Sequence, residues 1–284
     1  MIDVDPAWLG PVLEGYDVAF RDVEYEQSIR CPLGTHDDNH PSASLHLGKG
    51  LWHCHTCDRG GDAIEIIKER EHVAFSEAVT RASAGMREAN ERYVQAMTPE
   101  AASWLGARRI GKEAAVGASL GVVPNDPMLG HERFIGMISI PYKTKYVPVV
   151  GWKFRNLTGE GPKYDGPAGQ QARLYGVHTL SHSDTVLVCE GELDALVAQQ
   201  ETGLPAVGVP GASAWKKHYS RVLEGYQRVL VLADNDAGKD RNPGRELAKK
   251  ICESIPQAQA IDLPPGDVTD FVMAGGDLRG LIDR

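Results

Sequence analysis

A cluster of cysteines and histidines near the N-terminus constrains the fold more than any other feature of the sequence. Three of the five cysteines lie before residue 60, and Cys31, His36, Cys54 and Cys57 form a C-x4-H…C-x2-C pattern. Two such ligand pairs, brought together by a short hairpin, provide the tetrahedral set that a structural Zn²⁺ prefers. Metal binding would supply about 10–16 kcal/mol of folding free energy to a segment with little core of its own. The pattern therefore predicts a zinc-binding module.

The histidine ligand of this module is not fixed by the spacing alone. Four further histidines lie close enough in the sequence to replace His36: His40, His46, His53 and His55. The pattern defines the three cysteine ligands and leaves the fourth ligand open.

The overall composition limits where the chain acts and what it binds. No apolar run approaches the roughly 18 residues that a membrane helix needs, and the acidic start MIDVDPAWLG lacks the pattern of a signal peptide. We expect a cytoplasmic protein without a membrane partner, in the host cytoplasm if the chain is phage-encoded. The net charge of -9 disfavours nucleic-acid binding over the whole surface, so any DNA site must be a local basic patch.

Hydrophobic patterning divides the chain into three parts. A helix-favouring stretch covers residues 62 to about 97, and Thr98-Pro99-Glu100 then has the cap, proline and acid that begin a new helix. Short β-rich runs between residues 133 and 153 indicate antiparallel strands. Beyond residue 184, apolar runs alternate with helical segments, as in βαβ units around a parallel sheet. We predict an α/β chain with a zinc module and connector helix (1–97), a mixed α+β basic part (98–183) and a parallel-sheet domain (184–284).

Acidic residues follow two of the predicted parallel strands. Glu190 follows DTVLVC and precedes a helix that contains Asp194, while Asp234 and Asp236 follow RVLVLA. The carboxyl ends of parallel strands meet at one edge of a sheet, where the ligand crevice lies. Converging carboxylates would repel one another unless a divalent cation neutralised them, and Mg²⁺ binds a few carboxylates together with substrate phosphates. The pattern predicts a metal-dependent phosphoryl-transfer site.

A third acidic group follows the next predicted strand: Asp267 and Asp270. Each group by itself also has a simpler explanation. Acids at the start of a helix are stabilised by its dipole, and aspartates are common in turns. Only the combination of the three groups points to a metal site.

The zinc pattern, followed by E-G-x-x-D and D-x-D on a later α/β sheet, resembles DnaG-type bacterial and phage primases, and the acidic sheet resembles a TOPRIM domain. In that family the zinc ribbon reads roughly C-P-x-H, then P-S, then C-x-x-C followed by G-G-D. The matching residues here are Cys31-Pro32, His36, Pro41-Ser42, Cys54–Cys57 and Gly60-Gly61-Asp62. The resemblance favours His36 as the zinc ligand, although it stands two residues later after Cys31 than is usual.

Two further segments resemble basic parts of the primase polymerase domain. Trp104–Gly111 is similar to its opening helix, and Gly151–Gly176 is similar to a G-F-G-G-R element followed by P-K-Y and R-x-L-Y-G. Basic residues also outnumber acidic ones between residues 143 and 173. The candidate residues for binding template and nucleotide phosphates are Arg108, Lys153, Arg155, Lys163 and Arg173.

The resemblance implies a DNA primase, an enzyme that makes short RNA primers on single-stranded DNA during replication. This DNA-directed RNA polymerase activity is a metal-dependent nucleotidyl transfer. We expect Glu190, Asp234 and Asp236 to bind Mg²⁺ or Mn²⁺, and Asp194, Asp267 and Asp270 to support them. The expected partners are single-stranded DNA and ribonucleoside triphosphates, with the replicative helicase of the primosome as a further candidate. Because Asp270 lies close to the last residue, Arg284, we expect no C-terminal helicase-binding domain.

Two alternatives share parts of the pattern. A zinc and TOPRIM DNA-repair scaffold would bind DNA without polymerising nucleotides, but such proteins usually lack the P-K-Y segment. A TOPRIM nuclease would cut DNA, but it has no zinc ribbon. The products formed from ribonucleotides and single-stranded DNA would separate the three functions.

Overall fold

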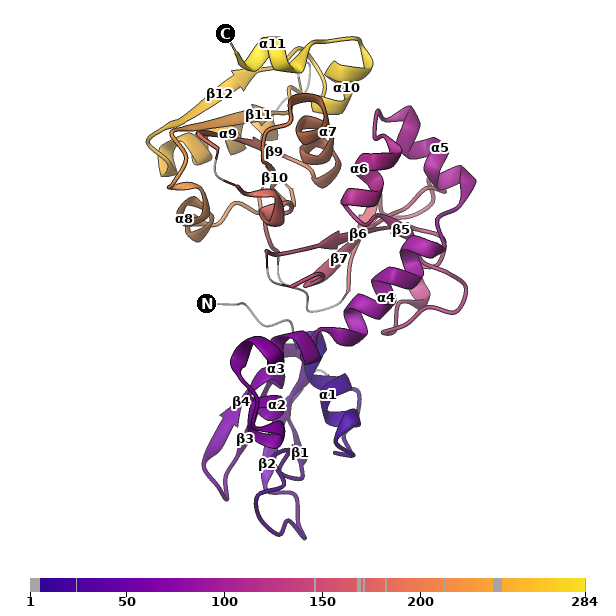
Figure 1. Cartoon of the computed structure of the whole chain (residues 1–284), viewed down its shortest axis with the longest axis vertical. Helices are drawn as coiled ribbons and strands as arrows, with labels where there is room; N and C mark the ends of the chain where they lie inside the picture. The colour runs from indigo at the N-terminus through magenta and orange to yellow at the C-terminus, as the bar shows by residue number, and fades with distance from the viewer. Residues whose placement is uncertain are drawn as a thin grey trace.

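The computed structural model describes residues 6–23, 25–145, 147–167, 170, 172–181, 183–211, 213–236 and 242–283. In this part of the chain the backbone forms three four-stranded sheets, and each sheet uses four consecutive strands of the sequence. The first sheet lies at one end of the molecule and is joined to the other two by a helix (Figure 1). The predicted fold class, α/β with an N-terminal ribbon and a parallel sheet, is confirmed.

The first sheet is an antiparallel ribbon around the cysteine cluster. Its strands lie side by side in the order β1 (Gln27–Ile29), β2 (Ala43–His46), β3 (Leu51–Cys54) and β4 (Arg59–Gly61). Successive side chains of a strand point to opposite faces, and Ile29, Leu45 and Trp52 are the buried members on one face. Three helices lie against this ribbon (Figure 1): α1 (Leu9–Gly15), α2 (Ala63–Glu71) and α3 (Phe75–Ala82).

The helix-favouring stretch after the ribbon forms three helices instead of one continuous connector. Asp62 caps α2 by accepting hydrogen bonds from the N–H groups of Ile64 and Glu65 at 2.8 and 3.1 Å. His72 ends α2 in the left-handed region, with φ 54°. After α3, α4 (Ala84–Gln95) runs from the ribbon to the second sheet (Figure 1). The connector is therefore α4, and the two preceding helices belong to the core of the ribbon module.

The second sheet is antiparallel and lies next to α4. Its order is β5 (Gly121–Val122), β6 (Ile138–Tyr142), β7 (Gly151–Arg155) and β8 (Tyr164–Asp165). A Cβ on Gly121 would lie 2.3 Å from the Tyr93 carbonyl, so α4 and β5 pack too closely for any other residue. Two helices precede the sheet: α5 (Pro99–Ala107) and α6 (Lys112–Gly117). Thr98 caps α5 by accepting a hydrogen bond from the N–H of Ala101, as the sequence predicts.

The third sheet is parallel, with the order β10 (Ala206–Gly208), β9 (Thr185–Cys189), β11 (Arg228–Ala233) and β12 (Ala258–Asp262). Alternate residues of its central strands pack into different cores: Leu187, Cys189, Leu230 and Leu232 with α7 (Glu192–Thr202), and Val186, Val188, Val229 and Val231 with α9 (Pro243–Ser254). Burial on both faces explains why these strands are continuous apolar runs in the sequence.

The remaining helices are short. They are η1 (Pro6–Trp8), η2 (Leu47–Lys49), η3 (Glu132–Phe134), η4 (Val177–Thr179), η5 (Lys217–Tyr219), α8 (Ser220–Leu223), α10 (Val268–Met273) and α11 (Leu278–Ile282). No helix in the described ranges is both long and apolar enough to span a bilayer.

Candidate functional site

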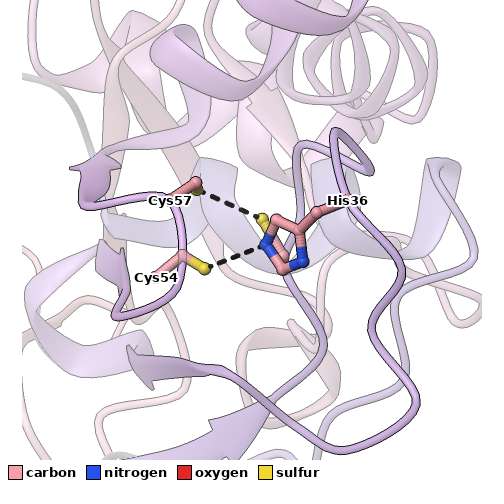
Figure 2. Close-up of side chains that lie close together, drawn as sticks. His36, Cys54 and Cys57 are labelled. Carbon is pink, nitrogen blue, oxygen red and sulfur yellow. Dashed lines mark hydrogen bonds between the residues drawn. The ribbon is translucent and has the colours of Figure 1, made fainter.

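Three separate segments of the ribbon bring the four predicted zinc ligands together. Cys31 follows β1, His36 lies in the loop before β2, and Cys54 and Cys57 flank the turn after β3. Their ligand atoms all lie within 4.8 Å of one another. His36 Nε2 is 3.3 Å from Cys54 Sγ (Figure 2), and the Sγ atoms of Cys31 and Cys57 are 3.9 Å apart. Two sulfurs on a tetrahedral Zn²⁺ with bonds of about 2.3 Å would lie about 3.8 Å apart, so the arrangement fits zinc.

The histidine in this group is His36. The four alternatives, His40, His46, His53 and His55, do not join the group of ligand atoms. Burial alone would raise the pKa of the Cys54 thiol, but hydrogen bonds from Ser42, the Cys57 backbone and His36 lower this pKa to about 6. Zinc binds the thiolate, so the surroundings of Cys54 favour the ligand form before a metal arrives.

The predicted acidic groups meet at one edge of the parallel sheet. Cys189, the last residue of β9, pairs with Leu232, and β11 ends one residue later at Ala233, so Glu190 and Asp234 both follow their strands at this edge. Burial, and after it the charges of four neighbouring acids, raise the pKa of Asp234 to about 8. In decreasing order of effect these acids are Asp194, Glu190, Asp267 and Asp236. Four of the five other predicted acids thus lie within electrostatic reach of Asp234.

Asp194 is held in place by a residue that the sequence did not single out. Its Oδ1 accepts hydrogen bonds from the backbone N–H and the hydroxyl of Thr269, at 3.2 and 2.6 Å. Burial and then the charge of Asp267 raise the pKa of Asp194 to about 6. These two hydrogen bonds join the first turn of α7 to the first turn of α10.

The loops after β11 and β12 are also tied directly to each other. The backbones of Asn235 and Gly266 exchange two hydrogen bonds, at 2.9 and 3.0 Å. Gly266 has φ +116°, and a Cβ there would lie 2.8 Å from Asp270 Oδ2, so a larger residue would disturb this bridge. Asp267 and Asp270 form a capping box at the start of α10, in which each side chain accepts a hydrogen bond from the other's backbone N–H. The exposed Asp270 thus has a structural role whether or not it supports a metal.

The acidic residues fit a divalent cation. Asp234 Oδ1 is buried and has no hydrogen-bond partner among the described residues. A buried, unpaired carboxylate oxygen surrounded by like charges is unfavourable on its own, and a bound cation removes both penalties. Glu190, Asp234 and Asp236 are the residues that would bind it, with Asp194 and Asp267 next to them.

Basic and aromatic residues form a second group beside the acids. The Arg155 guanidinium is buried, and it lies 5.0 Å from the ring centre of Trp104 and 4.9 Å from that of Tyr164. The Arg108 guanidinium lies 4.4 Å from the centre of the same Trp104 ring. Lys163 is exposed, and its Nζ lies 5.9 Å from the centre of the Tyr164 ring. Trp104 was not among the predicted site residues, and both arginines lie over its ring.

Tyr164 connects the two groups electrostatically. The pKa of Tyr164 is raised to about 12, mainly by burial. The charges of Glu192 and Asp194 add to this increase, and those of Arg155 and Arg108 oppose it. This tyrosine therefore lies between the acidic edge and the two arginines. Cations beside clustered carboxylates are the arrangement that a polyanion bound together with a metal ion would need.

The other two predicted basic residues have different surroundings. Lys153 Nζ donates to both carboxylate oxygens of Glu192, at 2.8 and 3.0 Å. Arg173 is half-buried and lies two residues before Tyr175, which bridges to Gly208 of β10. Lys153 also lies over the Tyr164 ring, with Nζ 4.7 Å from the ring centre, and thus joins the basic and aromatic group to Glu192.

The raised acid pKa values give a prediction about stability and pH. A carboxyl whose pKa is raised on folding stabilises the protein below its unfolded pKa, and this contribution is lost as the pH rises through the folded value. For Asp194 and Asp234 the loss covers the range from about 4 to about 8. Cation binding needs the deprotonated acids, so added Mg²⁺ should raise the melting temperature by roughly 3 °C or more at about pH 8.5, and hardly at about pH 5.5.

Thermal denaturation at the two pH values, with and without Mg²⁺, tests this. No chelator is used, so that the zinc site stays intact. Equal stabilisation at both pH values would contradict a proton-linked carboxylate site.

Two protein families match separate parts of the chain. Residues 10–96 match the CHC2 zinc finger family, and residues 185–277 match the Toprim domain family. The first range contains the four predicted zinc ligands, and the second contains all six predicted catalytic acids.

Relatives and solved structures extend the similarity beyond these two ranges. The Gene 57 protein of Mycobacterium phage D29 is 37% identical over 155 residues, which cover 52% of this chain and 97% of that protein. The DNA primase of Thermotoga maritima is 25% identical over 267 residues, covering 72% of this chain and 47% of that protein. The chain thus spans about half the length of this primase, and 53% of the length of the Deinococcus radiodurans primase.

Among solved structures, the zinc-binding and RNA polymerase domains of the Aquifex aeolicus primase match with a TM-score of 0.56 and 20% identity. That match covers 99% of this chain and 83% of the other. A DnaG primase catalytic domain bound to single-stranded DNA matches with a TM-score of 0.54 and 21% identity, covering 67% of this chain and 76% of the other. At these identities the likeness concerns the fold.

Proposed function

Because the chain belongs to the DnaG-type primase family, we propose that it makes short RNA primers on a single-stranded DNA template by metal-dependent nucleotidyl transfer. The observation that carries this proposal is the convergence of Glu190, Asp194, Asp234 and Asp267 beside the arginines stacked on Trp104. Such a site suits a reaction between a nucleic-acid end and a nucleoside triphosphate.

In this mechanism Glu190, Asp234 and Asp236 would hold Mg²⁺ or Mn²⁺. The ion, when bound, would supply charge neutralisation for the triphosphate and Lewis-acid activation of the primer 3′-hydroxyl. Thr269 fixes Asp194, and the Asn235–Gly266 bridge fixes the two acidic loops. The carboxylates are thereby oriented before substrate binds, which reduces the entropic cost of aligning the reacting groups.

The cations beside the acids would bind the substrates. Arg108 and Arg155 are held against Trp104, and their guanidinium groups suit bidentate contacts with phosphate oxygens. Lys163 and Arg173 remain further candidates. The DnaG domain bound to single-stranded DNA, which shares this fold, supports DNA as the template. We propose ribonucleoside triphosphates as the second substrate and the replicative helicase as a candidate partner.

The zinc module would select the start site on the template. We retain residues 1–97, 98–183 and 184–284 as the proposed division into zinc module, basic part and Toprim domain. The similarity to a mycobacterial phage protein supports a site of action in the cytoplasm of a host cell. The repair scaffold and the nuclease are not favoured, because the relatives that match most of the chain are DNA primases.

A product assay separates these functions directly. The full chain is incubated with single-stranded DNA, labelled ribonucleotides and Mg²⁺ or Mn²⁺. New RNA oligomers are the expected result. Cut DNA would indicate a nuclease, and binding without any product would indicate a scaffold.

A further inference from the structure

A buried network joins the second sheet to the Toprim sheet. Lys153 of β7 forms a bidentate ion pair with Glu192, the first residue of α7, and Tyr142 of β6 donates a hydrogen bond of 2.6 Å to Glu192 Oε1. The Glu192 side chain is 1% exposed and that of Lys153 is 21% exposed. A carboxylate this deeply buried is stable only when it is paired and hydrogen-bonded, so all three residues are needed together.

The position of Glu192 gives this network a second consequence. Glu192 lies in the chain between Glu190 and Asp194, and it is the first residue of α7, the helix that contains Asp194. Without its partners Glu192 would be one more carboxylate at the acidic edge. Neutralisation of the Glu192 charge by Lys153 therefore lowers the negative charge near a bound cation.

The network also changes the interpretation of Lys153. From the sequence, Lys153 is a candidate for binding nucleic acid, because it lies in a basic segment. Its ammonium group contacts both oxygens of Glu192 and lies 4.7 Å from the Tyr164 ring centre. Lys163, at the adjoining strand, is exposed and lies on the same ring. The two lysines thus have different surroundings despite equal charge.

We propose that Lys153, Glu192 and Tyr142 form a charge-balanced joint that fixes the basic sheet against the first turn of α7, keeping Glu192 out of the metal site and Lys153 from contacting the DNA phosphates. In this proposal the three are positioning residues, which act through the placement of α7 and its acids. The inference rests on the proposed function, but its tests measure metal and DNA binding and not primer synthesis.

Metal binding provides the first test. Mn²⁺ binding to the full chain is measured by electron paramagnetic resonance for wild type, Lys153→Met, Glu192→Gln and the double variant. Lys153→Met leaves the Glu192 charge uncompensated and should tighten Mn²⁺ binding about fivefold, whereas Glu192→Gln leaves the lysine charge and should weaken it about fivefold. The double variant restores the charge balance and should bind within about twofold of wild type.

A purely structural role would weaken binding in both single variants, so shifts of the same sign would overturn the proposal. The single variants leave a lone buried charge and are expected to be the less stable proteins, whereas the double variant has none. If the single variants are too unstable to titrate, melting temperatures decide. A double variant less stable than either single variant would also overturn the joint.

DNA binding provides the second test, with Lys163 as the matched lysine. Affinity for a labelled single-stranded oligonucleotide is measured over a range of salt concentrations. Losing one phosphate contact reduces the slope of log affinity against log salt by about 0.7 for single strands. Lys163→Met should show this reduction, and Lys153→Met should keep the wild-type slope. A reduced slope in Lys153→Met would show that Lys153 contacts DNA and would overturn the proposal. An unchanged slope in Lys163→Met would contradict the proposed contact between Lys163 and a DNA phosphate.

Discussion

Asp234→Asn is expected to lower the rate of primer synthesis at least about a hundredfold while the protein stays folded. Asp234 follows β11 at the centre of the acidic group, and its buried Oδ1 has no hydrogen-bond partner in the described part of the chain. Replacing one oxygen by an amide removes the charge that a cation needs, at the place where charge develops during nucleotidyl transfer. Incorporation of labelled ribonucleotides on single-stranded DNA measures the effect.

Although Asp234→Asn should lose activity, its thermal stability should be unchanged or higher. Burial and four like charges destabilise the ionised form of Asp234, so the asparagine variant should melt no lower than wild type in the absence of Mg²⁺ at about pH 8. Asp262→Asn is the matched control, because Asp262 ends the neighbouring strand β12 with a side chain that is 91% exposed. It should keep its activity. Near wild-type synthesis by folded Asp234→Asn would remove the proposed metal site.

The parallel sheet and its acidic edge could be predicted because they depend on local sequence. Strands buried on both faces must be apolar throughout, as in β9 and β11, and an acid directly after such a strand lies at its carboxyl end. The cysteine spacing predicted the zinc cluster for a similar reason, since a hairpin brings the two pairs together. In both cases the signal is local: each acid directly follows its own strand, and each pair of zinc ligands lies within a few residues.

The contacts that fix the site could not be predicted, because they join distant residues. Thr269 lies 75 residues from the Asp194 carboxylate that it holds, and Lys153 lies 39 residues from Glu192. The sequence shows that Lys153 is basic but not that a buried carboxylate faces it. His72 is a smaller example: its left-handed backbone ends α2 within a stretch of good helix formers. Charge and propensity are local properties, whereas pairing is set by the tertiary fold.

Cys54→Ser is expected to unfold the ribbon module and to abolish primer initiation. The four ligands come from three segments that the small sheet alone holds weakly, and structural zinc contributes about 10–16 kcal/mol to the folding of such modules. Serine lacks the thiolate that the surroundings of Cys54 favour. Limited proteolysis should therefore cleave the variant within residues 10–96, while the Toprim sheet stays protected.

Comparing initiation with extension then separates the module's role from a general loss of folding. If the zinc module selects the start site, Cys54→Ser should fail to begin primers on bare template but should still extend a preformed RNA primer, because the acidic edge lies in another sheet. Cys252→Ser is the matched control, since Cys252 lies on α9 and outside the ligand group. Normal initiation by protein that has lost its zinc would mean that the ribbon stabilises the N-terminal part without choosing where primers begin.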